Sequence, residues 1–267
     1  MIKKACCIVL FTILFLHPIS IYASSQSSYQ EYLIEFDSYR ATLNEFKIAR
    51  SEYLKFKTLT SQQSALEKTK RMLASRSQLL RSYLQFLNEK LNENASMDAI
   101  NKNLYATLIQ NEVKFLNNHT GLMSSISSLQ DAESVSQQLS SHYTMLQSTI
   151  YQIIVGLKMA ELTAIDTQYY ELFTKTYSFI QTQKSSYTPN KQSTMERWLL
   201  QIQNKRDLYT QKRNDIIKEN TTLKSASLTE IAASYQRIIK LLSEARQYLS
   251  EGTSFLQELT TSMQYGE

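Results

Sequence analysis

The fold is decided by residues 228–263, which read LTEIAASYQRIIKLLSEARQYLSEGTSFLQELTTSM. Eleven positions in this stretch follow one another at alternating spacings of three and four residues. They are Leu228, Ile231, Tyr235, Ile238, Leu242, Ala245, Leu249, Gly252, Leu256, Leu259 and Met263. A spacing that averages about 3.5 residues keeps one stripe of a helix facing a partner helix along its whole length, which is the condition for a coiled coil.

A second stripe widens the apolar face of this helix. Leu241, Tyr248 and Phe255 lie seven residues apart, each one position before a leucine of the first stripe. A face this wide suits a bundle helix with several neighbours better than a two-stranded zipper. We therefore predict that the helix packs against helices of its own chain. Its closest approach, or its weak point, is expected at Gly252, where the stripe has no side chain.

The N-terminal half of the chain predicts a helical hairpin. An aromatic stripe predicts a first helix over residues 27–58, and Ser64 with Glu67 is typical of a capping box before a second helix. The second helix carries leucines seven residues apart, which fit either an intermolecular zipper or a hairpin with the first helix. These leucines are Leu66, Leu73, Leu80 and Leu87. The hairpin is favoured because a short connection costs little loop-closure entropy.

The same spacing continues through the middle of the chain. A third helix follows residue 98, with a kink or a turn at residues 117–121. Asp131 is expected to cap a long fourth helix that reaches Lys184. Residues 185–192, which include Pro189, form the clearest linker. Two further capping boxes, Ser193 with Glu196 and Ser227 with Glu230, are expected to start the fifth and sixth helices.

These patterns predict an all-α protein, an elongated antiparallel coiled-coil bundle of about six long helices after an N-terminal signal peptide. The chain has only four glycines and two prolines, so few residues are available for the turns of a β-rich fold. The predicted organisation is a signal peptide over residues 1–23, helical hairpins and a long central helix over 24–184, a linker over 185–193, and a C-terminal hairpin of the same bundle over 194–267.

The N-terminus has the order of parts of a secretory signal. Lys3 and Lys4 precede an apolar stretch over residues 5–16, Pro18 then breaks any helix, and Ala23 offers a small residue for cleavage. The alternative is an uncleaved membrane anchor, because residues 5–23 approach the length that spans a bilayer. Both interpretations place the bulk of the chain outside the cytosol.

Composition excludes several kinds of site. Cys6 and Cys7 both lie in the predicted signal, so the chain after residue 23 has no thiol for disulfides, zinc–thiolate sites or nucleophilic catalysis. Without Lys3 and Lys4, the 29 basic residues become 27 against 24 acidic residues, a net charge of +3. This balance does not support binding of nucleic acid.

The sequence shows no catalytic or cofactor signature. The histidines after residue 23 are His119 and His142, and neither has a second ligand three or four residues away, as a metal site on a helix requires. His142 is expected to be a partly buried spacer. Glycine-rich phosphate loops and the common hydrolase motifs are also missing from the sequence. We therefore predict no catalytic residue, no cofactor and no metal, and a protein that is not an enzyme.

Basic side chains offer the best candidate binding surface. They gather in residues 64–82 and 197–213, and the candidates for anion binding are Lys68, Lys70, Arg71, Arg76, Arg81, Arg206 and Arg213. Sixteen of the 17 tyrosines follow residue 23. Tyrosine suits both the boundary of a helical bundle and a recognition surface, so the tyrosines leave these two roles open.

These observations predict an exported, non-enzymatic coiled-coil protein of the cell envelope or exterior, with a structural or protein-interaction role. Its partner is expected to be another envelope or extracellular protein. The alternative is an extracytoplasmic helical-bundle module that binds a small ligand, an anionic polymer or a lipid headgroup. Heptad spacing alone does not separate pairing within one chain from pairing between chains, so the oligomeric state stays open.

Overall fold

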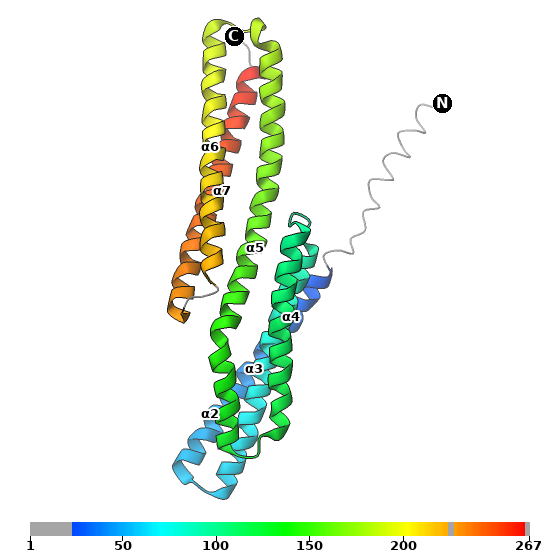
Figure 1. The fold of residues 1–267 in the computed structure, drawn as a ribbon, viewed down its shortest axis with the longest axis vertical. Helices are drawn as coiled ribbons and strands as arrows, with labels where there is room; N and C mark the ends of the chain where they lie inside the picture. The colour runs from blue at the N-terminus through cyan, green and yellow to red at the C-terminus, as the bar shows by residue number, and fades with distance from the viewer. Residues whose placement is uncertain (1–22, 224–226, 265–267) are drawn as a thin grey trace, which may run out of the picture. The chain divides into compact units, whose positions relative to one another are not determined.

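The computed structural model describes residues 23–223 and 227–264, so the predicted signal peptide, apart from Ala23, lies outside the described residues. This described part is all-helical, with six α-helices, several of them long, packed antiparallel (Figure 1). The helices are α2 (Ala23–Phe56), α3 (Leu59–Glu93), α4 (Ala99–Gly121), α5 (Leu129–Gln183), α6 (Pro189–Thr222) and α7 (Leu228–Gln264). Two short 3-10 turns, η2 (Leu122–Ser125) and η3 (Lys184–Ser186), precede α5 and α6. The predicted all-α antiparallel bundle is confirmed.

Contacts divide the chain into two compact units. The described part of unit 1 holds residues 23–93 and 113–135. Unit 2 holds residues 94–112, 136–223 and 227–264. The boundary falls inside α4 and α5, so each of these helices contributes one part to each unit.

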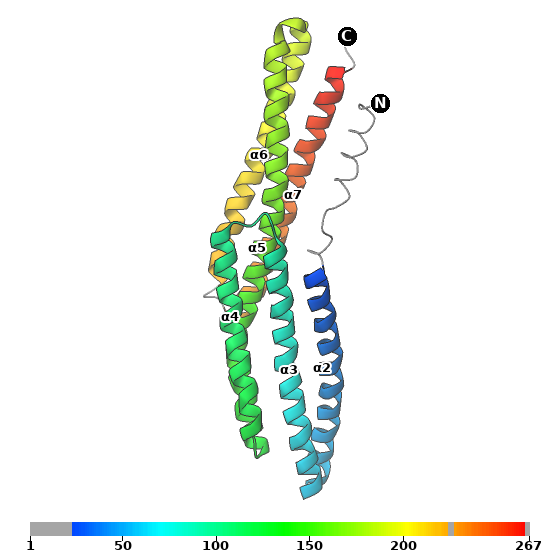
Figure 2. The same ribbon diagram turned by 90° about the vertical axis from the view of Figure 1, so that its right-hand side faces the viewer.

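In unit 1, α2 and α3 lie side by side as an antiparallel hairpin, as Figures 1 and 2 both show. Lys57 follows α2 with a left-handed φ of 52°, and its N–H donates to the carbonyl of Tyr53 at 2.9 Å, which ends the helix. On α3, Leu73 and Leu87 are buried. The hairpin interpretation of the leucine stripe is confirmed.

Aromatic rings from both helices line this hairpin. The ring centroids of Tyr29 and Phe86 lie 5.3 Å apart, and those of Tyr32 and Tyr83 lie 5.1 Å apart. Aromatic pairs at this distance add a favourable quadrupole interaction to the apolar area that they bury. A second group of buried side chains packs on α3 nearer the turn, namely Met72, Leu73, Ile126, Ala132 and Val135.

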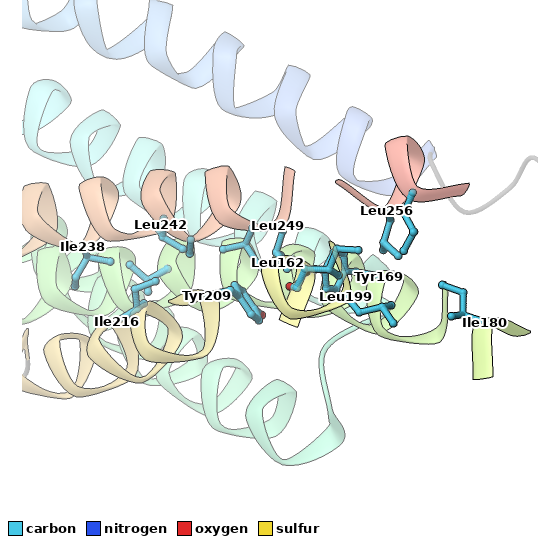
Figure 3. Close-up of a cluster of buried hydrophobic side chains, with 14 of the residues drawn as sticks. Leu162, Tyr169, Ile180, Leu199, Tyr209, Ile216, Ile238, Leu242, Leu249 and Leu256 are labelled. Carbon is cyan, nitrogen blue, oxygen red and sulfur yellow. Dashed lines mark hydrogen bonds between the residues drawn. The ribbon is translucent and has the colours of Figure 1, made fainter. Parts of the chain in front are cut away.

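Unit 2 is built around a three-helix core of α5, α6 and α7 (Figure 3). Each helix contributes buried apolar side chains at helical spacing, which places them on one face. The side chains labelled in Figure 3 are Leu162, Tyr169 and Ile180 of α5, Leu199, Tyr209 and Ile216 of α6, and Ile238, Leu242, Leu249 and Leu256 of α7. Full burial of one such leucine or isoleucine stabilises a fold by about 1.5–3 kcal/mol.

The two stripes of α7 behave as the sequence predicts for a bundle helix. The first stripe is buried from Ile231 onward except at Tyr235 and Met263, which are half-buried. The second stripe is half-buried and packs against the same core. At Gly252, the Tyr169 ring of α5 lies so close that an added Cβ would come within 2.9 Å of its Cζ atom. The predicted close approach at this glycine is confirmed.

The capping box predicted at Ser64 and Glu67 is wrong. Helix α3 begins earlier, at Leu59, where the Ser61 N–H donates to the Thr58 hydroxyl at 3.2 Å. Ser64 therefore lies inside the helix. The sequence from Thr58 to Ser64 offers several hydroxyls that can cap a helix, and the pattern alone does not choose among them.

The capping box predicted at Ser193 and Glu196 is also wrong, and the linker is shorter than expected. Thr188 caps α6, accepting a hydrogen bond from the Lys191 N–H at 3.4 Å, and Pro189 is the first helical residue. Proline suits this first position because its fixed φ is helical and its missing N–H would have no partner there.

The capping box predicted at Ser227 and Glu230 is confirmed at the start of α7. The Ser227 N–H donates to the Glu230 carboxylate at 2.8 Å, and the Glu230 N–H donates back to the Ser227 hydroxyl at 3.4 Å.

At the start of α5, the capping residue lies one helical turn earlier than predicted. The Asp131 N–H donates to the Ser128 hydroxyl at 3.1 Å. Hydrogen bonds to its carboxylate, chiefly from the hydroxyl of Ser127, lower the pKa of Asp131 to about 2.

Candidate functional site

Five of the predicted anion-binding side chains lie on α3 in unit 1, and three of them contact other residues of this unit. These contacts join Lys68 to the Glu45 carboxylate at 2.7 Å, Lys70 to the Ile126 carbonyl at 3.0 Å and Arg81 to Oδ1 of Asn117 at 2.8 Å. The hydrogen bond and charge of Lys68, together with the charge of Arg71, lower the pKa of Glu45. The Glu45 carboxylate neutralises the charge of Lys68, while the two neutral acceptors only occupy donors of Lys70 and Arg81.

Arg76 is different because two nitrogens of its guanidinium are buried in unit 1. Its Nε and Nη2 atoms are shielded from solvent and have no hydrogen-bond acceptor among the described residues. Burial lowers the pKa of Arg76, and Tyr39 and His119 lie near enough to interact with its charge. A buried cation without a counter-ion costs stability, so Arg76 is a poor element of an exposed binding surface.

His119 is a structural residue of unit 1. It is 2% exposed, its Nδ1 lies 3.0 Å from the Ser77 hydroxyl, and its Nε2 lies 2.9 Å from the Val135 carbonyl. Since a carbonyl only accepts, the neutral ring carries its hydrogen on Nε2, and Nδ1 accepts from the hydroxyl. Burial lowers the pKa of His119, which favours this neutral form.

The remaining two predicted residues, Arg206 and Arg213, lie in unit 2 on α6. Arg206 binds the Asp166 carboxylate of α5 through Nε at 2.8 Å and Nη2 at 3.3 Å. Its guanidinium also stacks on the ring of Tyr170, 3.9 Å from the ring centroid. The charge of Arg206 is therefore satisfied within the bundle, as a bidentate pair of this geometry allows.

Arg213 lines a cavity of about 380 Å³ in unit 2. The cavity lies between the start of α4, the middle of α5 and the C-terminal half of α6. Its apolar walls include Leu104, Val155, Met159 and Ile216. This volume and this mixture of apolar walls with a few polar groups are typical of sites for small molecules.

A glycine shapes one wall of the cavity. The Tyr105 ring of α4 lies against Gly156 of α5, where an added Cβ would come within 2.7 Å of the tyrosine hydroxyl and closer still to the ring carbons. Only the missing side chain lets the ring enter here. Burial raises the pKa of Tyr105, while the neighbouring Asn220 side chain opposes this rise.

Two polar groups of the cavity differ in how they are satisfied. The Asn220 Oδ1 atom is buried and accepts no hydrogen bond from the residues that the structure describes. Leaving such an atom unpaired costs about 1–3 kcal/mol. Asp98, by contrast, caps α4, and its two oxygens accept from the N–H and Nδ2 of Asn101 at 2.9 and 2.6 Å. These hydrogen bonds lower the pKa of Asp98.

Unit 2 also contains a buried carboxylate–histidine pair that the sequence did not indicate. Nε2 of His142 on α5 lies 2.7 Å from the Glu112 carboxylate of α4, and the Thr149 hydroxyl lies 3.5 Å from the other oxygen. Glu112 is buried and His142 is half-buried, as predicted for a spacer. The two residues come from different helices, so no spacing along one helix could have revealed the pair.

An apolar groove of about 480 Å³ runs between α5 and α6 in unit 2. Its lining includes Tyr170, Tyr177 and Leu200, which are 46%, 45% and 70% exposed. The groove is open, and its walls are mainly aromatic and aliphatic side chains. It is the second candidate site of this unit.

Within residues 23–223 and 227–264, no group of three or more His, Cys, Asp or Glu side chains is placed to hold a metal ion. Over the same ranges, none of the helices combines the length and the apolar character needed to cross a membrane. Comparisons with protein-family models, with curated proteins and with solved structures found no match for this chain.

Proposed function

We propose that the chain is an exported, non-enzymatic interaction protein of the cell envelope or exterior, which binds another protein through apolar side chains on its helices. The observation that carries this proposal is the groove between α5 and α6. A leucine that is 70% exposed lies there beside two exposed tyrosines. Tyrosine is enriched at protein interfaces, and a contiguous exposed apolar patch on a soluble domain often marks one.

Two further features support the proposal. The basic residues and apolar stretch that open the sequence have the order of a secretory signal, which supports export. The predicted basic residues are largely engaged within their own units, as for Lys68 and Arg206, which favours a protein partner over an anionic polymer or lipid surface.

Site-specific crosslinking in cells tests the proposal. A photoreactive phenylalanine analogue is placed at Leu200 and, in a matched control, at the exposed Gln201 of the same helix. We expect the Leu200 position to capture one envelope or extracellular protein that the Gln201 position does not. Binding of that purified partner should weaken by about tenfold in Leu200→Lys and stay unchanged in Gln201→Lys.

Two outcomes would contradict the proposal. The first is equal crosslinking from both positions, which would mean that the groove has no partner. The second is recovery of the chain in the cytosolic fraction with residues 1–23 still present, which would remove the exported location.

A further inference from the structure

We propose that the cavity of unit 2 binds a small organic anion with an apolar body and one hydrogen-bond donor, as in a hydroxylated aromatic carboxylate. Three features carry this proposal. They are the guanidinium of Arg213, the unpaired amide oxygen of Asn220 and the apolar walls around Tyr105. The site is separate from the apolar groove, so it does not depend on the proposed protein partner.

The register between α5 and α6 leaves Arg213 without a counter-ion. Arg206 and Arg213 lie seven residues apart on one face of α6, and Arg206 meets Asp166 of α5. Because the helices are antiparallel, the α5 position seven residues before Asp166 corresponds to Arg213, and that position is Met159, which lines the cavity. Arg213 makes no ion pair or hydrogen bond with another residue in the described ranges. A half-buried guanidinium is thus available to a carboxylate.

Asn220 continues the same face of α6, seven residues after Arg213. Its Oδ1 atom can only accept a hydrogen bond, so a ligand satisfies it with an O–H or N–H group. The distance along the helix between these two residues is about 10 Å at 1.5 Å per residue, which a six-membered ring with substituents at opposite ends can bridge. Apolar side chains and the Tyr105 ring also line the cavity, so they are available to contact such a ring.

The charges that line the cavity favour an anion over a cation. Asp98 and Arg213 are its charged side chains. The Asp98 carboxylate already accepts two hydrogen bonds from Asn101. Its charge also compensates the positive end of the α4 dipole. The Arg213 charge has no such partner, so it determines which ligand the cavity takes.

Glycine-selective NMR provides a direct test on the chain without residues 1–23. All four glycines lie after residue 23, so ¹⁵N-glycine labelling gives four amide signals. We expect titration with 4-hydroxyphenylacetate to move the Gly156 signal, since Gly156 lines the cavity, and to leave the Gly252 signal in place. Loss of one signal in the variants G156A and G252A assigns the two glycines.

Ligand and protein variants separate the contacts. 4-Hydroxyphenylacetamide, which lacks the charge, should bind about tenfold more weakly than the acid, and Arg213→Gln should weaken the acid by a similar factor. Phenylacetate lacks the donor and should lose several-fold in affinity, a loss that disappears in Asn220→Leu. Arg197→Gln, at an exposed arginine of the same helix outside the cavity, should have no effect.

Several results would overturn the proposal. If the Gly156 signal does not move with about 10 mM 4-hydroxyphenylacetate, the cavity takes no such anion. If Arg213→Gln binds the acid as well as the native chain does, the guanidinium is not the recognition group. If tyramine binds more tightly than the acid, the cavity selects a cation through Asp98. Circular dichroism of each variant confirms that the helices are retained.

Discussion

The contact between Gly252 of α7 and Tyr169 of α5 predicts that Gly252→Ala destabilises unit 2. An alanine Cβ would lie 2.8 Å from Cε2 and 2.9 Å from Cζ of the tyrosine, and closer still to its hydroxyl oxygen. Tyr169 has little freedom to move away. It is 4% exposed, and its hydroxyl donates to the Ile202 carbonyl at 2.7 Å.

Two opposing effects set the size of this change. Glycine is about 1 kcal/mol less favourable than alanine inside a helix, so the substitution by itself would stabilise α7. Forcing a methyl group into a packed core costs about 1–3 kcal/mol. Displacing the Tyr169 hydroxyl from its carbonyl costs about 1 kcal/mol more. We therefore expect a net loss of about 1–3 kcal/mol in the free energy of unfolding, measured by urea titration with far-UV circular dichroism.

A matched glycine and a second variant control this experiment. Gly121, with φ −59°, has no atom within 4 Å of an added Cβ, so Gly121→Ala should be neutral or stabilising by up to about 1 kcal/mol. Tyr169→Phe removes the atom nearest to the new methyl group. In that background Gly252→Ala should cost at least about 0.5 kcal/mol less. If Gly252→Ala is as stable as the native chain, or if its cost is the same in both backgrounds, then the Tyr169 ring does not exclude a methyl group at this position.

Three further changes follow from the structure. Burial lowers the pKa of His119 below its unfolded value of about 6.5, so the unfolded chain binds the proton more readily. The free energy of unfolding should therefore fall by up to about 1.4 kcal/mol per pH unit below pH 6.5. Urea titrations at several pH values should show this slope in the native chain and not in His119→Asn. His142→Ala leaves the buried Glu112 carboxylate without its nearest partner and should cost about 2–4 kcal/mol, whereas equal stability of the variant would show that the pair is not coupled. Lys57→Gly relieves a left-handed backbone, so it should stabilise the fold by about 0.5–1 kcal/mol and raise the melting temperature. Lys55→Gly, at an exposed position in the last turn of α2, should lower the melting temperature.

The sequence was most informative where the chemistry is local. The stripes of α7 predict the buried face and the close approach at Gly252, because a helical face follows directly from residue spacing. Helix starts were harder to predict, because hydroxyl residues occur throughout this chain and several candidates stand near each boundary. At α6, Thr188 followed by Pro189 was the better signal, since proline is favoured at the first helical position.

The sequence by itself determined that this chain is a set of long amphipathic helices, because helix periodicity is written in residues that are neighbours along the chain. Only the tertiary structure decided which faces meet. It shielded two guanidinium nitrogens of Arg76 from solvent and paired Glu112 with His142. It also placed Arg213 beside a cavity, whereas Arg206 pairs with Asp166. Such contacts depend on the register between helices, and a repeated apolar stripe fits several registers equally well.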